Sequence, residues 1–416
     1  MSIWHIYGGN RLTGSTRVQG AKNAVLPIMA ASVLSGGETV LHNVPDLRDV
    51  TTTLRILQHL GCTAVRDGDT VRIDSRGMHC DFIPHALMRE LRSSVIFLGA
   101  ILARFGTARL SMPGGCELGP RPVNLHLDAL RALGAEVTER GGDIICRAHA
   151  LQGRRILLPF PSVGATENAM LAACAAAGET VICNAAREPE IEDLAGYLNR
   201  CGAHIHGAGE SCIVIEGVPH LYGSTYTVMP DRIAAATYMA AAAVTGGTVL
   251  LRDVNSEHLL PVLSAFESTG CAVMQSGSEL LLRAPQRLKP VRHVRTMPYP
   301  GFPTDAQAPV MTMAAVGDGT SIFVENIFES RYKHAGELNR LGAKIKLEGK
   351  VAVIEGVPQL SGAPVSAEDL RGGAALVIAG LAAQGETQVM HPQYIDRGYA
   401  HFEENLRALG ADVYRI

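Results

Sequence analysis

The sequence is short of aromatic residues, of charge of one sign and of long apolar runs. Aromatic residues make up 5% of the 416 residues, whereas apolar residues make up 47%. The formal net charge is -3 at pH 7, so the chain lacks the basic excess with which proteins coat nucleic acid or anionic membranes. The most apolar stretches, residues 234–244 and 372–383, fall short of the roughly 20 residues of a membrane-spanning helix. We therefore expect neither a nucleic-acid partner nor a membrane partner.

The cysteine pattern excludes two further classes of protein. The nine cysteines are odd in number, scattered, and form no Cys-x-x-Cys pair. This argues against a disulfide framework and against a zinc site, and it fits a reducing compartment. Residues 1–6 show no basic segment followed by an apolar one, so no secretion signal is expected. A cytoplasmic protein with no metal site is the expectation.

An internal repeat organises the chain. A segment of the type Leu-x-x-Leu-Gly-Ala, followed by alternating polar and apolar residues, occurs six times, with its glycine at positions 61, 134, 202, 270, 342 and 410. The separations of 73, 68, 68, 72 and 68 residues keep a period near 70. Because glycine directly after a helix supplies the positive φ of a C-cap, each segment predicts a helix end.

A second mark has the same period. Glycine, then threonine directly or after one Glu, precedes a short β-rich run at Gly37, Gly106, Gly178, Gly247, Gly319 and Gly385. Each repeat therefore predicts a helix, a strand, a second helix and two closing strands, such as residues 343–347 and 351–354. Three repeats per domain give residues 22–229 as one domain and residues 1–21 plus 230–416 as the other. The opening strand, residues 3–19, could pair with a sheet of either domain.

Charged residues occupy one position of the repeat, just ahead of the predicted first helix. Five of the six residues there are charged: Lys22, Arg92, Gly164, Asp231, Asp305 and Arg371. A helix N-terminus attracts anions and repels cations, so Lys22, Arg92 and Arg371 call for an explanation other than helix stability. Asp231 and Asp305 could have a functional role or could serve only as helix N-caps, and the sequence favours neither explanation.

Arginine recurs at a second position, the loop after the inner strand. The residues are Arg48, Arg121, Arg187, Arg331 and Arg397. If the repeats are pseudo-symmetric, these loops gather with the helix starts at one end of each domain, and two facing ends form a cleft lined with guanidinium groups. Guanidinium groups match phosphate and carboxylate oxygens, so we expect a small ligand with several negative charges. Arg48 and Arg187 could instead form structural ion pairs.

The second repeat holds a longer loop than the others. The interval from Gly106 to Gly134 is 28 residues, against 23 to 25 elsewhere, and residues 112–122 contain three glycines and three prolines. We expect this loop to move as a lid. Its Cys116 lies near Arg121, whose charge favours the thiolate. A cysteine in an alanine-rich helix, such as Cys174, is better explained as a small core residue.

Nine motifs between Gly14 and the C-terminus make the chain similar to a known family. They are Gly20-Ala21-Lys22-Asn23-Ala24, Pro113-Gly114-Gly115-Cys116, Ser162-Val163-Gly164-Ala165-Thr166, Ala186-Arg187-Glu188-Pro189-Glu190, Pro230-Asp231-Arg232, Phe302-Pro303-Thr304-Asp305, Phe328-Glu329-Ser330-Arg331, Asp369-Leu370-Arg371 and Ile395-Asp396-Arg397-Gly398-Tyr399. The chain resembles the UDP-N-acetylglucosamine 1-carboxyvinyltransferases, enolpyruvyl transferases that begin bacterial peptidoglycan synthesis.

The resemblance implies a fold and a set of site residues. The fold is a two-domain inside-out α/β barrel with the active site in the interdomain cleft and the N-terminal strand in the C-terminal domain. Phosphoenolpyruvate and UDP-N-acetylglucosamine are the implied partners. Lys22, Arg121 and Arg397 would hold phosphoenolpyruvate, and Arg92, Arg331 and Arg371 would complete the anionic pocket. The remaining substrate-binding residues would be Asn23, Pro122, Val123, Asn124, Leu125, Ser162, Val163, Gly164, Asp231, Thr304, Asp305, Ile327 and Asp369.

The resemblance also implies a mechanism that needs no cofactor. Carbon 2 of phosphoenolpyruvate becomes electrophilic when carbon 3 is protonated, with Cys116 as the acid and Asp305 as the base for the sugar 3-hydroxyl. Lys22 and Arg397 belong to the catalytic cationic cluster. Because Cys116 carries a thiol in this loop, we expect epoxide phosphonates such as fosfomycin to alkylate it. A mass shift that persists in a Cys116→Asp variant would assign the modification to another residue.

The sequence departs from the family's pattern at one position, and three alternative functions remain to be weighed. Position 124 is Asn where the family usually has Asp, which puts uridine recognition in question. A 5-enolpyruvylshikimate-3-phosphate synthase shares the architecture but lacks the loop of Cys116. A non-catalytic UDP-sugar-binding paralogue should have lost Cys116, Asp305 or Lys22. A structural ring of repeats would need a basic inner surface. We expect a monomeric enzyme.

Overall fold

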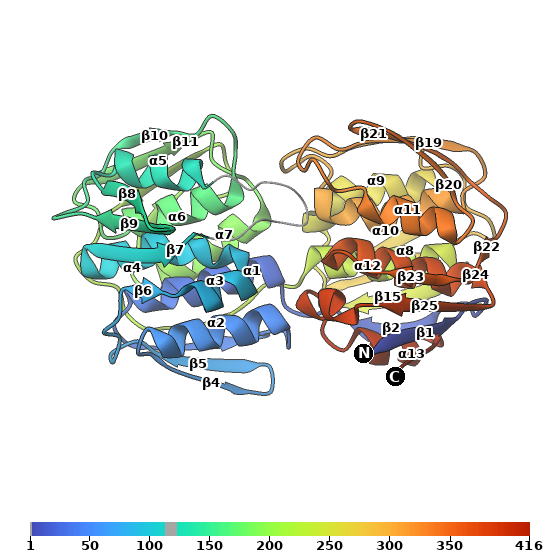
Figure 1. Ribbon diagram of the computed structural model, residues 1–416, viewed down its shortest axis with the longest axis horizontal. Helices are drawn as coiled ribbons and strands as arrows, with labels where there is room; N and C mark the ends of the chain where they lie inside the picture. Colours follow the sequence, from blue (N-terminus) through green and yellow to red (C-terminus); the bar gives the residue numbers. More distant parts are fainter. Residues whose placement is uncertain (1, 113–122) are drawn as a thin grey trace. The chain divides into compact units, whose positions relative to one another are not determined.

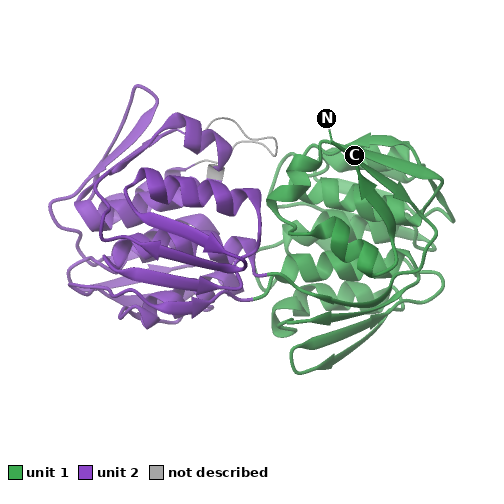
Figure 2. Cartoon of the chain, turned by 90° about the horizontal axis from the view of Figure 1, so that it is seen from below, with its two compact units in different colours: residues 1–19, 117–119, 230–416 green, residues 20–116, 120–229 purple. Residues whose placement is uncertain are grey.

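The computed structural model describes residues 2–112 and 123–416, which form two compact units (Figure 2). Unit 1 contains residues 2–19 and 230–416, and unit 2 contains residues 20–112 and 123–229. Each unit is built from three copies of one repeat, and each copy contributes one four-stranded sheet. The predicted α/β class and the six repeats are therefore confirmed.

The elements of unit 2 follow the repeat in chain order. They are α1 (Lys22–Ala31), η1 (Ser32–Leu34), β3 (Glu38–His42), α2 (Arg48–His59), β4 (Thr63–Asp67), β5 (Thr70–Asp74), β6 (Phe82–Ile83), α3 (His85–Glu90), η2 (Arg92–Ile96), α4 (Phe97–Phe105), β7 (Thr107–Ser111), α5 (Asn124–Ala132), β8 (Glu136–Arg140), β9 (Asp143–Arg147), β10 (Arg155–Leu157), α6 (Val163–Ala173), β11 (Glu179–Cys183), α7 (Pro189–Arg200), β12 (His204–His206), β13 (Cys212–Glu216) and β14 (Thr225–Thr227). The short helices α3 and η2 ahead of α4 were not predicted.

Unit 1 repeats the same order after two opening strands. Its elements are β1 (Ile3–Tyr7), β2 (Thr13–Arg17), α8 (Arg232–Val244), β15 (Thr248–Arg252), η3 (Glu257–Leu259), α9 (Leu260–Ser268), β16 (Ala272–Ser276), β17 (Glu279–Arg283), β18 (His293–Arg295), α10 (Thr304–Ala315), β19 (Thr320–Val324), α11 (Lys333–Arg340), β20 (Lys344–Glu348), β21 (Val351–Glu355), β22 (Leu360–Ser361), β23 (Pro364–Ser366), α12 (Leu370–Ala382), β24 (Ala383–Gln384), β25 (Glu386–Met390), η4 (Pro392–Arg397), α13 (Phe402–Ala408) and β26 (Asp412–Arg415).

Each four-stranded sheet has one parallel edge strand, and four of these strands, β6, β10, β18 and β23, come from the end of the preceding repeat. In the sheet β18-β19-β21-β20, β18 pairs parallel with β19, and β21 pairs antiparallel with β19 and β20. The sheets β6-β7-β9-β8, β10-β11-β13-β12 and β16-β17-β15-β2 have the same pattern. In unit 2, β14 of the last repeat pairs parallel with β3 of the first, so the three sheets are linked in a closed ring.

The N-terminal segment closes unit 1. Strand β1 lies between β25 and β26, in the place that a repeat's own second closing strand takes in the other sheets. The chain ends meet there, since the Ile3 N–H donates to the Ile416 carbonyl over 2.7 Å. Strand β2 pairs parallel with β15. The segment expected as one strand is therefore two strands in two sheets, both in unit 1 as the resemblance implied.

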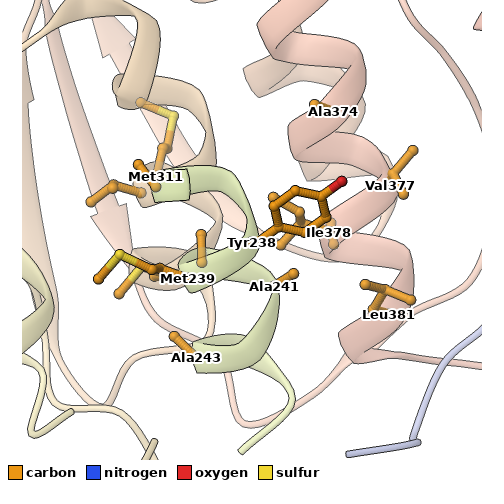
Figure 3. Close-up of a cluster of buried hydrophobic side chains, with 14 of the residues drawn as sticks. Tyr238, Met239, Ala241, Ala243, Met311, Ala374, Val377, Ile378 and Leu381 are labelled. Atoms are coloured by element: carbon orange, nitrogen blue, oxygen red, sulfur yellow. The ribbon is translucent and has the colours of Figure 1, made fainter. Parts of the chain in front are cut away.

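The inner helices lie at the centre of each unit with the sheets outside them (Figure 1). In unit 1 these are α8, α10 and α12, and almost every residue of α8 and α12 is buried. Figure 3 shows Tyr238 and Met239 of α8, Met311 of α10, and Val377 and Ile378 of α12 within one apolar cluster. The many alanines of these helices, with the glycines of α12, let them pack closely. Helices inside and sheets outside confirm the inside-out arrangement.

The repeated glycines end the outer helices as predicted. All six adopt φ between 91° and 98°, and each lies two residues after the last residue of α2, α5, α7, α9, α11 or α13. A side chain is strained at such φ values, which accounts for glycine in every copy. None of the helices within residues 2–112 and 123–416 combines the length and apolarity needed to cross a bilayer.

The closure of unit 1 by β1 can be tested at Trp4. Its side chain is 2% exposed and packs on the ring of Phe402, with centroids 5.9 Å apart. We expect Trp4→Ala to lower the free energy of unfolding by about 3–5 kcal/mol, measured by urea denaturation, because it leaves a cavity in the core. The control is Tyr7→Ala on the same strand, where Tyr7 is 37% exposed. Equal losses in both variants would contradict the role of β1 in the core.

Candidate functional site

The residues singled out at the helix starts lie mostly inside the helices. Lys22 is the first residue of α1, and Gly164, Asp305 and Arg371 are the second residues of α6, α10 and α12. The prediction that these four precede their helices is therefore wrong by one or two residues. For two of them the reason is the capping: Ser162 is the N-cap of α6 and Asp369 is the N-cap of α12, so these two helices begin earlier than the repeat suggested.

The remaining predicted residues lie around the same helix starts. Arg92 opens η2, Asn23 follows Lys22 in α1, Val123 precedes α5, Asn124 and Leu125 open α5, Val163 opens α6, Thr304 opens α10, Ile327 lies in the loop after β19, and Arg397 ends η4. Cys116, Arg121 and Pro122 lie outside the described residues, as does the predicted lid. Within residues 2–112 and 123–416, no three His, Cys, Asp or Glu side chains form an arrangement able to hold a metal ion.

In unit 1, Asp305 lies between two buried arginines. Arg331 Nη2 donates to Asp305 Oδ1 over 2.8 Å, and Arg371 donates to Oδ2 from Nε over 3.2 Å and from Nη2 over 3.1 Å. Both arginine side chains are 2% exposed, whereas that of Asp305 is 26% exposed. Charge-assisted bonds to both oxygens hold the carboxylate in one orientation at the start of α10.

The surroundings of Arg371 favour its positive charge. Burial by itself would lower the pKa of Arg371, but Tyr399, Asp305 and Asp231 outweigh burial and hold that pKa above its ordinary value. The guanidinium also lies over the Tyr399 ring, 5.3 Å from its centroid. Tyr399 is in turn bonded to the Thr237 hydroxyl of α8 over 2.9 Å. The starts of α8, α10 and α12 therefore share one network.

The two explanations weighed for the aspartates now separate. Asp231 Oδ1 accepts the N–H groups of Ile233 and Ala234 over 2.8 and 2.9 Å, so it is the N-cap of α8. Asp305 is not the N-cap of α10, since that position is Pro303. The N-cap interpretation is therefore confirmed for Asp231 and wrong for Asp305.

Glu325 holds the loop that carries Ile327, and the sequence analysis missed it. Its side chain is buried directly after β19. Oε1 accepts the N–H groups of Ile327 and Phe328 over 2.8 and 3.0 Å, and Oε2 accepts the Thr304 hydroxyl over 3.0 Å. Glu325 thus ties the loop to the first residue of α10, beside Asp305. In the sequence, a carboxylate directly after an apolar strand was the pattern that could have indicated this role.

Gln19 holds the segment that follows Arg397, and it was also missed. Gln19 Nε2 donates to the Gly398 carbonyl over 3.1 Å, and Gln19 Oε1 accepts the Ala400 N–H over 2.7 Å. The backbone carbonyl of Gln19 accepts the Asp231 N–H over 2.8 Å. One residue near the end of the N-terminal segment therefore fixes both the turn after Arg397 and the cap of α8.

In unit 2, Lys22 has a buried partner. Its Nζ lies 3.0 Å from Asp49 Oδ2, and the Asp49 side chain is almost wholly buried at the start of α2. This carboxylate explains how a lysine is tolerated at a helix start, and it too was missed. Arg48 is exposed, whereas Arg187 Nε donates to the Gly209 carbonyl over 3.0 Å. Arg187 therefore makes a structural contact, as one of the two explanations weighed for it required. Its partner is a backbone carbonyl, so the contact is a hydrogen bond and not the ion pair that was considered.

Gly164 differs from its equivalents because an imidazole ring covers it. A Cβ atom at position 164 would lie 2.8 Å from Cε1 of His126, so no larger residue fits without movement. Asn168 Nδ2 donates to His126 Nδ1 over 2.7 Å, and burial lowers the pKa of His126 to about 4. A neutral ring with its proton on Nε2 follows. The starts of α5 and α6, which carry Asn124 and Ser162, are thus joined through this histidine.

Comparisons with known proteins agree with this geometry. Residues 6–406 match the family model described as EPSP synthase (3-phosphoshikimate 1-carboxyvinyltransferase). The chain is 49% identical to UDP-N-acetylglucosamine 1-carboxyvinyltransferase 2 of Caldanaerobacter subterraneus subsp. tengcongensis, with 100% of both chains covered. It is also 49% identical to UDP-N-acetylglucosamine 1-carboxyvinyltransferase 1 of Symbiobacterium thermophilum, covering 99% of this chain and 94% of that protein.

Solved structures of enolpyruvyl transferases have the same fold as this chain. The enolpyruvyl transferase NikO from Streptomyces tendae superposes with a TM-score of 0.91 at 25% identity, covering 100% of this chain and 98% of that one. An EPSP synthase from Acinetobacter baumannii shares the fold with a TM-score of 0.76 at 19% identity, with 100% of both chains covered. On the family model and the full-length relatives together, the chain belongs to the enolpyruvyl transferase family that includes EPSP synthase and UDP-N-acetylglucosamine 1-carboxyvinyltransferase.

Proposed function

We propose that this chain transfers the enolpyruvyl group of phosphoenolpyruvate to the 3-hydroxyl of UDP-N-acetylglucosamine and releases phosphate. The observation that carries the proposal is the Asp305 carboxylate, oriented by Arg331 and Arg371 and still partly exposed. The choice of acceptor is supported by full-length relatives of that name at 49% identity. The setting proposed with it is a cytoplasmic monomer in peptidoglycan synthesis.

In this proposal Asp305 is the general base. It accepts the proton of the sugar 3-hydroxyl while that oxygen attacks carbon 2 of phosphoenolpyruvate. Cys116 donates a proton to carbon 3, so that carbon 2 becomes electrophilic as the attack proceeds. The tetrahedral intermediate then loses a proton from carbon 3 and expels phosphate, which restores the double bond. Arg331 and Arg371 are buried and bonded to Asp305, so we assign them the role of orienting the base.

The remaining cations are proposed to bind phosphoenolpyruvate. Lys22, Arg121 and Arg397 are assigned to its phosphate and carboxylate, and Arg92 is assigned to the same anionic pocket. Lys22 is held by Asp49, and the turn after Arg397 is held by Gln19. Groups fixed in this way bind a developing charge without the cost of reorganisation.

The nucleotide sugar is proposed to contact the starts of α5, α6 and α10. The residues are Asn23, Pro122, Val123, Asn124, Leu125, Ser162, Val163, Gly164, Thr304, Asp305 and Ile327, with Asp231 and Asp369 as caps of the neighbouring helices. Asn124 is exposed at the start of α5, where its amide replaces the carboxylate usual in the family.

The acceptor and the base are tested together. We expect phosphate release from phosphoenolpyruvate with UDP-N-acetylglucosamine and none with shikimate 3-phosphate. Asp305→Asn should lower kcat by about 10²–10⁴-fold, because the amide cannot take the proton. The matched control is Asp318→Asn, which removes an exposed carboxylate bonded to Arg287 over 3.0 Å. Release with shikimate 3-phosphate alone would keep the fold and overturn the acceptor, and an active Asp305→Asn enzyme would overturn the base.

The positioning role of Gln19 predicts a second effect. Gln19→Ala removes two hydrogen bonds to the turn after Arg397, so we expect kcat/KM for phosphoenolpyruvate to fall about tenfold. Gln19→Glu keeps the acceptor for the Ala400 N–H but loses the donor to the Gly398 carbonyl. Its kcat/KM should therefore lie between that of the unmodified enzyme and that of Gln19→Ala. Gln58→Ala is the control, since Gln58 Nε2 bonds the Ala64 carbonyl over 2.8 Å elsewhere on the surface. Losses no larger than in this control would exclude the role of Gln19.

A further inference from the structure

Two cysteines that are far apart in the sequence face each other on the outer surface of a unit 2 sheet. Cys183 ends β11 and Cys212 begins β13, and the two residues are opposite each other in the antiparallel register. Their neighbours Ile182 and Ile213 are buried, so the cysteine side chains are on the opposite, outward face. Cys183 is half-buried and Cys212 is exposed. Solvent and small reagents can therefore reach this pair of thiols.

The backbone pairing brings these two residues close together. The Cys183 carbonyl accepts the Leu158 N–H over 3.0 Å on the side of β10, so it is turned away from β13. Cys183 and Cys212 are therefore a non-hydrogen-bonded pair, in which the Cα atoms of antiparallel strands lie about 4.5 Å apart. Disulfides span Cα separations of about 4.4–6.8 Å, so a bond between the two sulfurs requires no movement of the strands.

An arginine stands beside one of the two sulfurs. Arg155 of β10 donates from Nε to Cys183 Sγ over 3.3 Å. A guanidinium in this position stabilises the thiolate, which is the attacking form in disulfide exchange. The structure gives Cys183 this charged donor on its sulfur, so we assign Cys183 the attacking role and Cys212 the resolving role. The two thiols thus have different roles.

We propose that Cys183 and Cys212 form a modification site that small-molecule disulfides oxidise to a cross-strand disulfide. The Cys183 thiolate attacks the small disulfide and releases one thiol. Cys212 then loses its proton and attacks Cys183 in the mixed disulfide, which releases the second thiol. The two protein thiols lose two electrons and two protons, and the small disulfide is reduced to two thiols, so the exchange balances.

The bond would close the base of the loop that leaves β11 and carries Arg187. The loop that leaves β11 is held to the turn before β13 by the Ala185 N–H, which donates to the Ser211 carbonyl over 3.0 Å. Arg187 in the same loop donates to the Gly209 carbonyl. A disulfide between Cys183 and Cys212 fastens the two chain segments where they diverge, and so restrains this loop covalently.

A second pair of cysteines provides an internal comparison. Cys174 and Cys201, at the ends of α6 and α7, interact electrostatically but are 0% and 2% exposed. Burial raises the pKa of Cys174 to about 12, which disfavours its thiolate. Proximity without access should therefore leave this pair reduced under conditions that oxidise Cys183 and Cys212.

The test is disulfide mapping of the full chain equilibrated with glutathione buffers of increasing oxidised fraction. Non-reducing digestion and mass spectrometry should find a peptide pair joined through Cys183 and Cys212, lighter by two hydrogens, with Cys174 and Cys201 still free. A Cys212→Ser variant should accumulate glutathione on Cys183, because the resolving thiol is gone. Mapping by peptide separates these events from any reaction of Cys116.

Matched variants separate the proposal from general surface oxidation. Arg155→Ala should slow the first step severalfold, whereas Arg154→Ala, which changes the exposed neighbour, should not. Cys80→Ser should leave the cross-link unchanged. The proposal is overturned if oxidised glutathione yields only stable adducts at Cys183 or Cys212 in the unmodified chain. It is equally overturned if both thiols stay free while Cys80 reacts.

Discussion

Enclosure of the inner helices by one another and by the surrounding sheets is the constraint on which the rest of this structure depends. Helices α8, α10 and α12 are buried on every side, and their small side chains allow this close packing. A charged group in the middle of such a helix would lose its hydration without a partner. In these three helices the charged residues are therefore confined to the ends. Asp231, Asp305 and Arg371 all lie there, so the candidate site is a consequence of how the core is packed.

The charged groups at these ends compensate one another in pairs and networks. Asp305 takes Arg331 and Arg371, and Lys22 takes Asp49. Removing ions from water is costly, so such pairs are weak evidence for stability. They instead restrict each side chain to one geometry, which suits groups that must meet a small anionic substrate. Glu325 and Gln19 extend the same order to the backbone of the neighbouring loops.

Much of the fold could be predicted from the sequence, and part of the candidate site could. The six glycine turns and the helix-strand order were predictable, because turn conformation and capping depend on a few neighbouring residues. The starts of α6 and α12 were misplaced by a residue or two, since Ser162 and Asp369 cap them earlier than the repeat suggested. The N-terminal segment was expected as one strand, but β1 and β2 enter different sheets, because their partners lie at distant positions of the chain.

The partners of the charged residues show where local reasoning ends. Nothing near Arg331 or Arg371 in the sequence indicates that both bind Asp305, and nothing near Lys22 indicates Asp49. The spacing of the cysteines in the sequence indicated no pair, yet the strand register sets Cys183 opposite Cys212. The sequence by itself determined the repeat, the element order, the turns and the residues that match a known family, because these are local or periodic properties. Only the tertiary structure decided which charges pair, which loops are tied and which thiols meet, because those contacts join groups far apart in the chain.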